Sequence, residues 1–446
     1  MKNKAWLVCI FLLAVINIIL FWPGNLYFLN DDLLHIPLTD QGYLFQTNSV
    51  RPVHELLVKL ELFFSLKNAC GYHITALLLH FIVCIQLFDL CLLIQVKWLQ
   101  IPLQQAMQAA LLAVVLFLAY SQSSESLGWI LGRAPVLSAV FVMIALRLFF
   151  TRNYKWYNCF GGAFFFAVNL FAYEQTLLLP LVLMVAAFME MEREKRRGMF
   201  KYASVLCVVS IAYIIARKVI TSEVAGMYEA GNFLRMNWGT LVANAFRIIF
   251  RMILSPAPKT TFAASAVILL LVAGFIIYSA KKLSSNRKAI IFFASIILAL
   301  IVPVVSLGLA VNSFESGRFL YLPSIFFIIG LSIAGFDIVL QTERIKVPLL
   351  VFLVCLIAYW LEGKYTASKF YTNASLYSKS IHLKVQEHFK TSSDTLYLDT
   401  LHVTVHRLPV FRRGFKTGIH WLNDKIDTNK IVVKYFHDEV VHRELQ

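Results

Sequence analysis

The chain has 446 residues, of which 59% are hydrophobic and 15% are charged, and its mean hydropathy is +0.70. A soluble domain is nearer half apolar and a quarter charged, so these values argue against a soluble enzyme and predict a polytopic α-helical membrane protein. The net charge of +16 comes largely from short Lys/Arg clusters between apolar runs. Such clusters are typical of cytoplasmic loops, and they argue against nucleic-acid binding.

The apolar runs predict eleven membrane-spanning helices. We expect them at about residues 4–22, 72–95, 104–120, 129–150, 158–173, 175–190, 200–220, 262–280, 288–311, 319–340 and 347–362. The first run ends in Phe21, Trp22 and Pro23, without a small-residue cleavage site, so we interpret it as a retained span. If the N-terminus is cytoplasmic, alternation places nearly all the basic clusters inside.

Two of the expected outer loops are long, at residues 23–71 and 221–261. Within the first, residues 52–66 are amphipathic and predict a helix on the membrane surface. Within the second, residues 240–254 carry Arg247 and Arg251, four positions apart. Two arginines at the centre of a span are costly in lipid, so an interfacial or re-entrant helix is expected here.

Hydropathy falls after Leu361, and an odd number of spans places the remaining chain outside. We expect a helix at about 366–390 and strands at Thr395–Asp399 and Ile431–Phe436. The expected organisation is therefore a transmembrane domain, 1–362, and a small extracytoplasmic α/β domain, 363–446. The fold class is an all-α polytopic membrane protein with this small α/β addition.

An acidic pair, Asp31 and Asp32, follows the first expected span almost directly. Two adjacent carboxylates near lipid repel each other and lose water, so at least one should have a raised pKa. Such a group suits a general base or a metal ligand. The alternative is an ordinary solvated loop start, because Asp is a common turn residue.

Further charges lie where spans begin or end. Arg133 lies several residues inside an apolar helix, so it needs an anion, either a phosphate or a carboxylate such as Glu125 or Glu174. Arg318 opens the tenth expected span, where it could bind a phosphate through two N–H groups or simply reach the interface. Glu174 occupies a very short turn near the membrane surface, where a structural ion pair is as reasonable as a functional role.

Two histidines, His73 and His80, are seven positions apart and share one helix face. His73 should lie near the outer surface and His80 about 10 Å deeper. A buried histidine is more often a hydrogen-bonded core residue than a ligand, so His80 in particular is expected to be structural.

The order of these motifs resembles the GT-C superfamily of membrane glycosyltransferases. It is most similar to the membrane part of transmembrane O-mannosyltransferases that carry TPR repeats, and to their bacterial relatives without repeats. The resemblance covers roughly residues 1–340. It is carried by Asp31-Asp32, Arg51-Pro52, Gly71-Tyr72-His73 through His80, Glu125 to Gly132-Arg133, Tyr173-Glu174, and Arg318-Phe-Leu-Tyr-Leu-Pro323.

The resemblance implies transfer of a sugar from a polyprenyl-phosphate donor on the extracytoplasmic side. Asp31 or Asp32 would be the catalytic acidic residue, and Arg133 and Arg318 would hold the donor phosphate. Arg247 and Arg251 are weaker candidates for the phosphate. Supporting residues of the expected site are Arg51, His54, Glu55, His73, Glu125, Glu174 and Glu315.

Two departures from the family pattern leave the acceptor open. Where relatives often have Glu directly before the Arg of the Tyr-Leu-Pro block, this chain has Gly317, and Glu315 is displaced. The TPR tail is replaced by about 80 residues of mixed character. The acceptor is therefore a protein, a glycan or a lipid.

The main alternative is a transporter or flippase for a lipid-linked sugar, although neither a repeat nor acids on both faces are evident. A non-catalytic scaffold is a third reading. No cofactor is implied with certainty, and a divalent metal remains open. The expected location is the plasma (inner) membrane, with the N-terminus cytoplasmic and the site outside. The sugar and the oligomeric state do not follow from the sequence.

Overall fold

The structure is a computed structural model that describes residues 2–43, 51–151, 153–221, 237–256, 287–308, 313–341 and 346–436, together with 270, 272 and 274. It is almost entirely helical. The long helices are α1 (Lys2–Leu20), α4 (Ala69–Leu93), α5 (Leu103–Ala119), α7 (Ala134–Phe150), α8 (Trp156–Ala172), α9 (Leu179–Phe188), α10 (Arg193–Thr221), α13 (Arg287–Ile301), α14 (Arg318–Gln341) and α15 (Lys346–Thr391).

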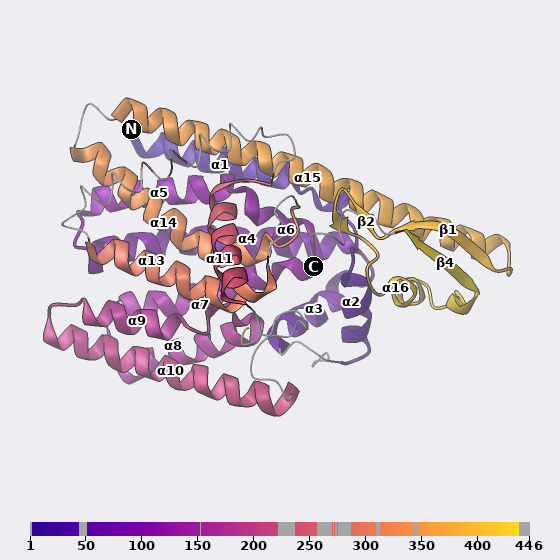
Figure 1. Cartoon of the computed structure of the whole chain (residues 1–446), viewed down its shortest axis with the longest axis horizontal. Coiled ribbons are helices and arrows are strands. Elements are labelled where there is room, and N and C mark those ends of the chain that lie inside the picture. The colour runs from indigo at the N-terminus through magenta and orange to yellow at the C-terminus, as the bar shows by residue number, and fades with distance from the viewer. Residues whose placement is uncertain are drawn as a thin grey trace.

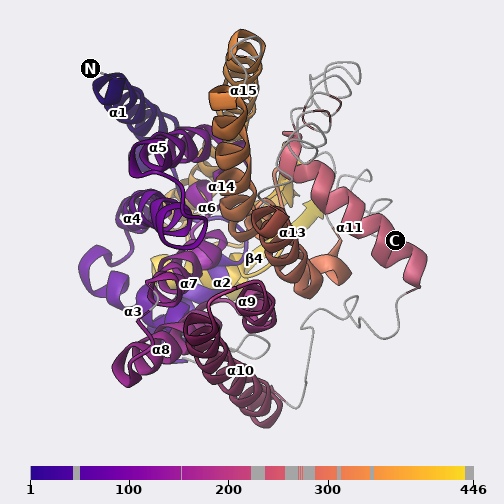
Figure 2. The same cartoon turned by 90° about the vertical axis from the view of Figure 1, so that its left-hand side faces the viewer.

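The remaining elements are shorter helices and four strands. They are α2 (Asp32–Asp40), α3 (Pro52–Ser65), α6 (Ser124–Gly128), α11 (Trp238–Ile253), α16 (Phe415–Leu422), β1 (Leu396–His402), β2 (Thr404–Val405), β3 (Leu408–Pro409) and β4 (Ile431–Phe436). Figure 1 shows the long helices running side by side, with α2, α3, α16 and the strands gathered at one end. Figure 2 shows the bundle from the opposite end. The end that carries α2, α3 and α16 is called the cap end below.

The chain is a polytopic helical membrane protein. Its described residues contain seven helices long and apolar enough to cross a membrane, or eight if the bent pair α5 and α6 forms one span. Each expected span among the described residues coincides with a helix, but α8 and α9 have only 17 and 10 residues. The expected span at 262–280 lies almost wholly outside the described residues. The count of eleven therefore stays a prediction.

The bend after α5 is stabilised by α11. At this 56° break the hydroxyl of Tyr120 donates to the carbonyl of Met252, and the amide of Gln122 donates to those of Arg251 and Leu254. Polar groups at membrane depth need such partners because lipid offers none. α11 itself runs across the direction of the bundle helices, as expected for an interfacial or re-entrant segment (Figures 1 and 2).

The last helix continues far beyond the expected span. α15 is one helix of 46 residues, about 69 Å long at 1.5 Å per residue. It contains the helix expected at 366–390, and the boundary expected between residues 362 and 363 falls inside it. No proline follows Pro348 in this stretch, so nothing in the sequence stops the helix where the apolar run ends.

The C-terminal region adds strands beside the second half of α15. β1 pairs in parallel with β4, with Leu396 opposite Ile431, and β2 pairs antiparallel with β3. β1 and β4 are the two strands that the sequence predicted, and α16 lies between them in the chain. A hydrophobic cluster at the cap end joins this region to α2, α3 and α4, through residues that include Phe28, Leu33, Tyr72, Phe415 and Ile419.

We predict that the cap end is extracytoplasmic. In a background without the seven native cysteines, Lys390→Cys near the end of α15 should react with a membrane-impermeant maleimide in intact cells. Glu194→Cys, in the first turn of α10 at the opposite end, should react only after permeabilisation, since basic loops stay inside. The reverse labelling pattern would contradict this orientation.

Candidate active site

Asp32 ties the start of α2 to the turn that precedes α7. Its side chain is fully buried, and its two oxygens accept hydrogen bonds from the backbone N–H groups of Leu29 (3.0 Å) and Leu131 (3.1 Å). Burial raises the pKa of Asp32 to about 8; the charge of Asp31 acts in the same direction, and the two N–H donors oppose it. Both oxygens of Asp32 are therefore occupied by the backbone.

Asp31 differs from Asp32 because one of its carboxylate oxygens accepts no hydrogen bond from the described residues. It directly precedes α2, is half-buried, and its side chain makes no capping hydrogen bond. Its Oδ1 is buried and has no hydrogen-bond partner among the described residues. A buried acceptor without a donor costs about 1–3 kcal/mol, which a ligand hydroxyl would offset. Of the acidic pair, Asp31 is the one with a buried oxygen that has no hydrogen-bond partner among the described residues, and this makes it the stronger candidate for a substrate contact.

Arg133 is held by a carboxylate that the sequence analysis did not single out. Its guanidinium is fully buried and forms a two-pronged ion pair with Glu61 of α3, one N–H···O distance being 2.6 Å. It also donates to the backbone carbonyl of Tyr72 at 2.8 Å. The expected structural partners were Glu125 or Glu174, so the pair exists but with a different acid. With this pairing, Arg133 has little capacity left for a donor phosphate.

Arg318 is paired with Glu125, from a segment nearly 200 residues away. The carboxylate of Glu125 accepts from the backbone N–H of Arg318 at 2.7 Å and from its Nη1 at 3.1 Å. The guanidinium lies over the ring of Trp129, with 4.6 Å to the ring centroid. The side chain of Arg318 keeps 18% of its surface exposed, so this cation remains accessible.

The departure at Gly317 has a steric explanation. A Cβ at Gly317 would lie 3.0 Å from the carbonyl oxygen of Gln122 and 3.5 Å from a Glu125 oxygen, so a larger residue would press on the Glu125–Arg318 pair. Glu315 instead turns to the C-terminal region, where it forms a two-pronged pair with Arg412 at 3.0 and 3.2 Å.

A second cation accompanies Arg51 at the turn between α8 and α9. Arg51 donates to both oxygens of Glu174, at 3.1 and 3.2 Å, and lies over the ring of Tyr173. Arg217, from the last turns of α10, reaches within 3.7 Å of the same carboxylate. Its side chain is only 6% exposed, and its Nε is buried without a hydrogen-bond partner among the described residues. Two arginines therefore share Glu174.

The other expected site residues have mainly structural surroundings. His80 lies within hydrogen-bond distance of the Tyr321 hydroxyl (2.8 Å), and His73 of the carbonyl of Leu127 (3.3 Å). Glu55 is buried in the first turn of α3, and Arg247 is exposed on α11. Arg251 is buried and donates to the side chain of Gln122 at 3.1 Å.

His54, in the first turn of α3, lies near several positively charged side chains. Burial holds the pKa of His54 well below its usual value, and nearby positive groups act in the same direction. These groups are Arg133, Arg51 and His35. Since His35 is one helical turn after Asp31, His54 links the Arg51 cluster to the start of α2.

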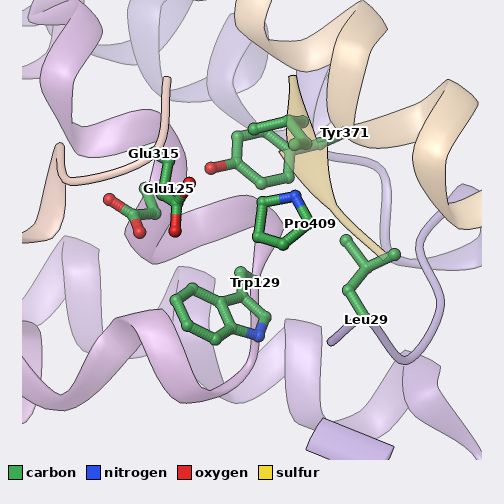
Figure 3. A pocket seen from close by; sticks show the side chains of 7 residues that line it. Leu29, Glu125, Trp129, Glu315, Tyr371 and Pro409 are labelled. Carbon is green, nitrogen blue, oxygen red and sulfur yellow. The ribbon is translucent and has the colours of Figure 1, made fainter. Parts of the chain in front are cut away.

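A small pocket lies beside the carboxylates of Glu125 and Glu315. Its lining consists of Leu29, Glu125, Trp129, Glu315, Tyr371, Leu408 and Pro409. Figure 3 shows the Tyr371 hydroxyl directed toward the carboxylates of Glu125 and Glu315. The pocket has room for about one water molecule, so it cannot hold a sugar as it stands. Among the described residues, no three His, Cys, Asp or Glu side chains are grouped as metal ligands.

Sequence reasoning missed Glu61, Arg217, Tyr371 and Arg412. Glu61 carried a usable signal, because it falls on the apolar face of the amphipathic helix α3, next to the buried Leu62. Arg217 is preceded by an apolar run of α10 and resembled a residue of an ordinary basic helix end. Tyr371 and Arg412 gave no signal, because their partners lie far away in the sequence.

Comparison with known proteins identifies one structural neighbour of note. No family model matches the chain, and no curated protein matches it by sequence. Among solved structures it is similar to the Archaeoglobus fulgidus oligosaccharyltransferase tethered to an acceptor peptide, with 11% identity and a TM-score of 0.49. The match covers 94% of this chain but only 63% of the archaeal one.

The archaeal protein is a GT-C enzyme, the class that the sequence motifs resemble. At this identity and TM-score the similarity does not carry a functional conclusion. The functional proposal therefore depends on the contacts described above.

We predict that the Glu61–Arg133 pair is required for folding. Glu61→Leu alone should leave a buried unpaired guanidinium and cost about 3–5 kcal/mol, seen as loss of monodisperse protein in detergent. The double variant Glu61→Leu/Arg133→Leu removes both charges and should recover much of the folded yield. If Glu61→Leu alone matches the native protein in yield and melting temperature, the pair is not structural.

Proposed function

We propose that the protein is an integral-membrane glycosyltransferase of GT-C type. It moves a sugar from a polyprenyl-phosphate donor to a hydroxyl of a protein, glycan or lipid acceptor. The reaction takes place at the extracytoplasmic face of the plasma (inner) membrane, and the N-terminus is cytoplasmic. In this proposal the cap end of the bundle faces outward.

One observation carries the proposal. Oδ1 of Asp31 is buried without a donor among the described residues, at the same end of the bundle as Arg51 and Arg318, which are partly exposed, and the buried Arg217. A lipid-linked sugar phosphate is half apolar and half anionic, so its enzyme needs a carboxylate and cations beside a lipid-facing surface. α10 supports this requirement, since Ile211, Ile215 and Val219 are exposed on the helix that carries Arg217.

The chemistry divides between the carboxylate and the cations. The acceptor hydroxyl gives its proton to Oδ1 of Asp31, and its oxygen attacks the anomeric carbon of the donor sugar. The bond from that carbon to the phosphate oxygen breaks, and polyprenyl phosphate leaves with the electron pair. Fixed arginines stabilise the growing charge without having to reorganise.

The contacts favour Arg51, Arg217 and Arg318 as phosphate ligands. Arg51 and Arg217 share one carboxylate, and Arg318 keeps an accessible edge. The two-pronged pair of Arg133 with Glu61 and its bond to the Tyr72 carbonyl argue against its expected role and for a structural one, although its buried Nε has no partner among the described residues. Arg247 and Arg251 remain secondary candidates.

A transporter for lipid-linked sugars is the second candidate, but no specific observation favours it. A carrier needs a polar path through the bundle. In the described part of the bundle the interior polar groups are engaged locally, as in the bonds of Ser138 with Asn169 and of His80 with Tyr321. These groups hold helices together and do not form a continuous polar path.

We predict that Asp31→Asn removes transfer. Purified protein in detergent, given a panel of polyprenyl-phosphate sugars and candidate acceptors, should release polyprenyl phosphate, and Asp31→Asn should lower this rate about 10²–10⁴-fold. Asp89→Asn is the matched control, because Asp89 is partly exposed and pairs with the exposed Arg147, away from the cap end. Vectorial lipid movement in vesicles, without sugar transfer or donor hydrolysis for any donor, would favour the transporter.

A second prediction concerns Arg217. Arg217→Lys keeps the charge but loses the planar fork that suits phosphate, so the KM for donor should rise roughly tenfold or more. The adjacent exposed cation provides the control, and Lys218→Ala should leave the KM unchanged. An Arg217→Lys enzyme with native kcat and KM would remove Arg217 from the phosphate site.

A further inference from the structure

The C-terminal region touches the chain immediately before Asp31. The backbone N–H of Asn30 donates to the carbonyl of Val410 at 2.7 Å, and the hydroxyl of Ser378 on α15 donates to the carbonyl of Phe28 at 2.8 Å. Asn30 has a φ of 47°, in the left-handed region that asparagine tolerates better than most residues. The turn that presents Asp31 is therefore stabilised from outside by residues some 350 or more positions later.

α16 packs on α2 with no space between them. A Cβ at Gly418 would lie 2.7 Å from the Leu33 side chain, and one at Gly414 would lie 2.7 Å from the backbone nitrogen of Leu34. Gly414 also has a φ of 74°, which a residue with a side chain rarely adopts. The two glycines allow α16 to lie directly against the first turn of α2 (Figure 1).

The far end of α16 is fixed to the far end of α2. The indole N–H of Trp421 donates to Asp40 at 2.8 Å, and the Trp421 ring meets Phe28 edge to face, with 5.4 Å between centroids. α16 thus contacts α2 near both of its ends. A shift of α16 cannot occur without a shift of α2, because closely packed interiors transmit displacement.

We propose that residues 408–422 are a positioning element that sets where the Asp31 carboxylate lies relative to the donor. This inference rests on the proposed role of Asp31 as the base. The contacts described above join the segment to residues 28–34 and to Asp40. It acts through the backbone of residues 28–34, so its loss should affect the chemical step and leave donor binding intact.

The test introduces a single methyl group at the α16–α2 contact. Gly418→Ala should lower kcat about tenfold or more, since small misplacements of a catalytic group have large effects on rate, with the KM for donor changed less than twofold. Lys416→Ala, on the exposed side of α16, is the matched control and should have native kinetics. Melting temperature in detergent is recorded for each variant, so that unfolding is not mistaken for misplacement.

A second substitution distinguishes positioning from general damage. The clash at Gly418 is with the side chain of Leu33, whereas that at Gly414 is with the Cβ and backbone nitrogen of Leu34 and the carbonyl carbon of Leu33, none of which Leu33→Ala removes. Leu33→Ala should therefore partly restore kcat in the Gly418→Ala enzyme and should not restore it in Gly414→Ala. If the glycine variants do not fold, Trp421→Phe keeps an aromatic ring but removes the hydrogen bond to Asp40, and it should still lower kcat severalfold.

The outcomes separate this inference from the proposed function. If Asp31→Asn is inactive while Gly418→Ala and Trp421→Phe have native kcat, the positioning role is wrong and the glycosyltransferase proposal stands. If donor KM rises with kcat unchanged, the segment serves binding and the positioning role is again wrong. If Asp31→Asn keeps native transfer, Asp31 is not the base and the positioning role is wrong with it. The proposed function itself fails only if the native protein shows neither sugar transfer nor donor hydrolysis with any donor.

Discussion

The buried Arg133–Glu61 pair is the interaction on which the cap end depends. A guanidinium with no exposed surface needs a carboxylate beside it, and that carboxylate comes from α3, a helix outside the bundle. Satisfying the charge therefore fixes α3 against α4 and α7. Once α3 is fixed, Arg51, which directly precedes it, lies at Glu174. His54, in the first turn of α3, lies near His35 of α2.

The same pair shows why the cap end separates into structural and accessible charges. Arg133 and Asp32 are both fully buried with their hydrogen-bonding capacity largely used inside the protein. Asp31 and Arg318 are partly exposed, and Oδ1 of Asp31 has no hydrogen-bond partner among the described residues. A site that must bind a substrate needs such a graded arrangement, because fully satisfied groups have nothing left to offer and fully exposed ones are surrounded by water.

The fold was largely predictable from sequence because hydropathy alone locates helices in a membrane protein. All the expected spans among the described residues are helices, and the two expected strands pair with each other. The site was less predictable. Arg133 was recognised as needing an anion, but its partner Glu61 depends on how α3 folds back, which no local pattern encodes. The same holds for Glu315 and Arg412, which are 97 residues apart.

The boundary of the C-terminal region could not be predicted from local sequence either, because the expected boundary between residues 362 and 363 falls inside α15. Hydropathy marks where lipid contact ends, whereas a helix ends only where capping, proline or packing stops it. α15 meets none of these at residue 362 and continues along the cap-end cluster, where Ala367, Tyr371 and Ala374 are buried against it. In this chain the apolar run ends near residue 362, whereas the helix that contains it continues to Thr391.

The length of α15 has a mechanical consequence. A single helix of 46 residues is a stiff rod, with its first half among the membrane-crossing helices and its second half bound to the turn at Phe28 through Ser378. Membrane helices adjust to bilayer thickness by tilting. A rod cannot tilt at one end only, so any tilt within the lipid becomes a lateral displacement at its outer end, enlarged in proportion to distance. A change in bilayer thickness that tilts α15 therefore also displaces the loop before Asp31.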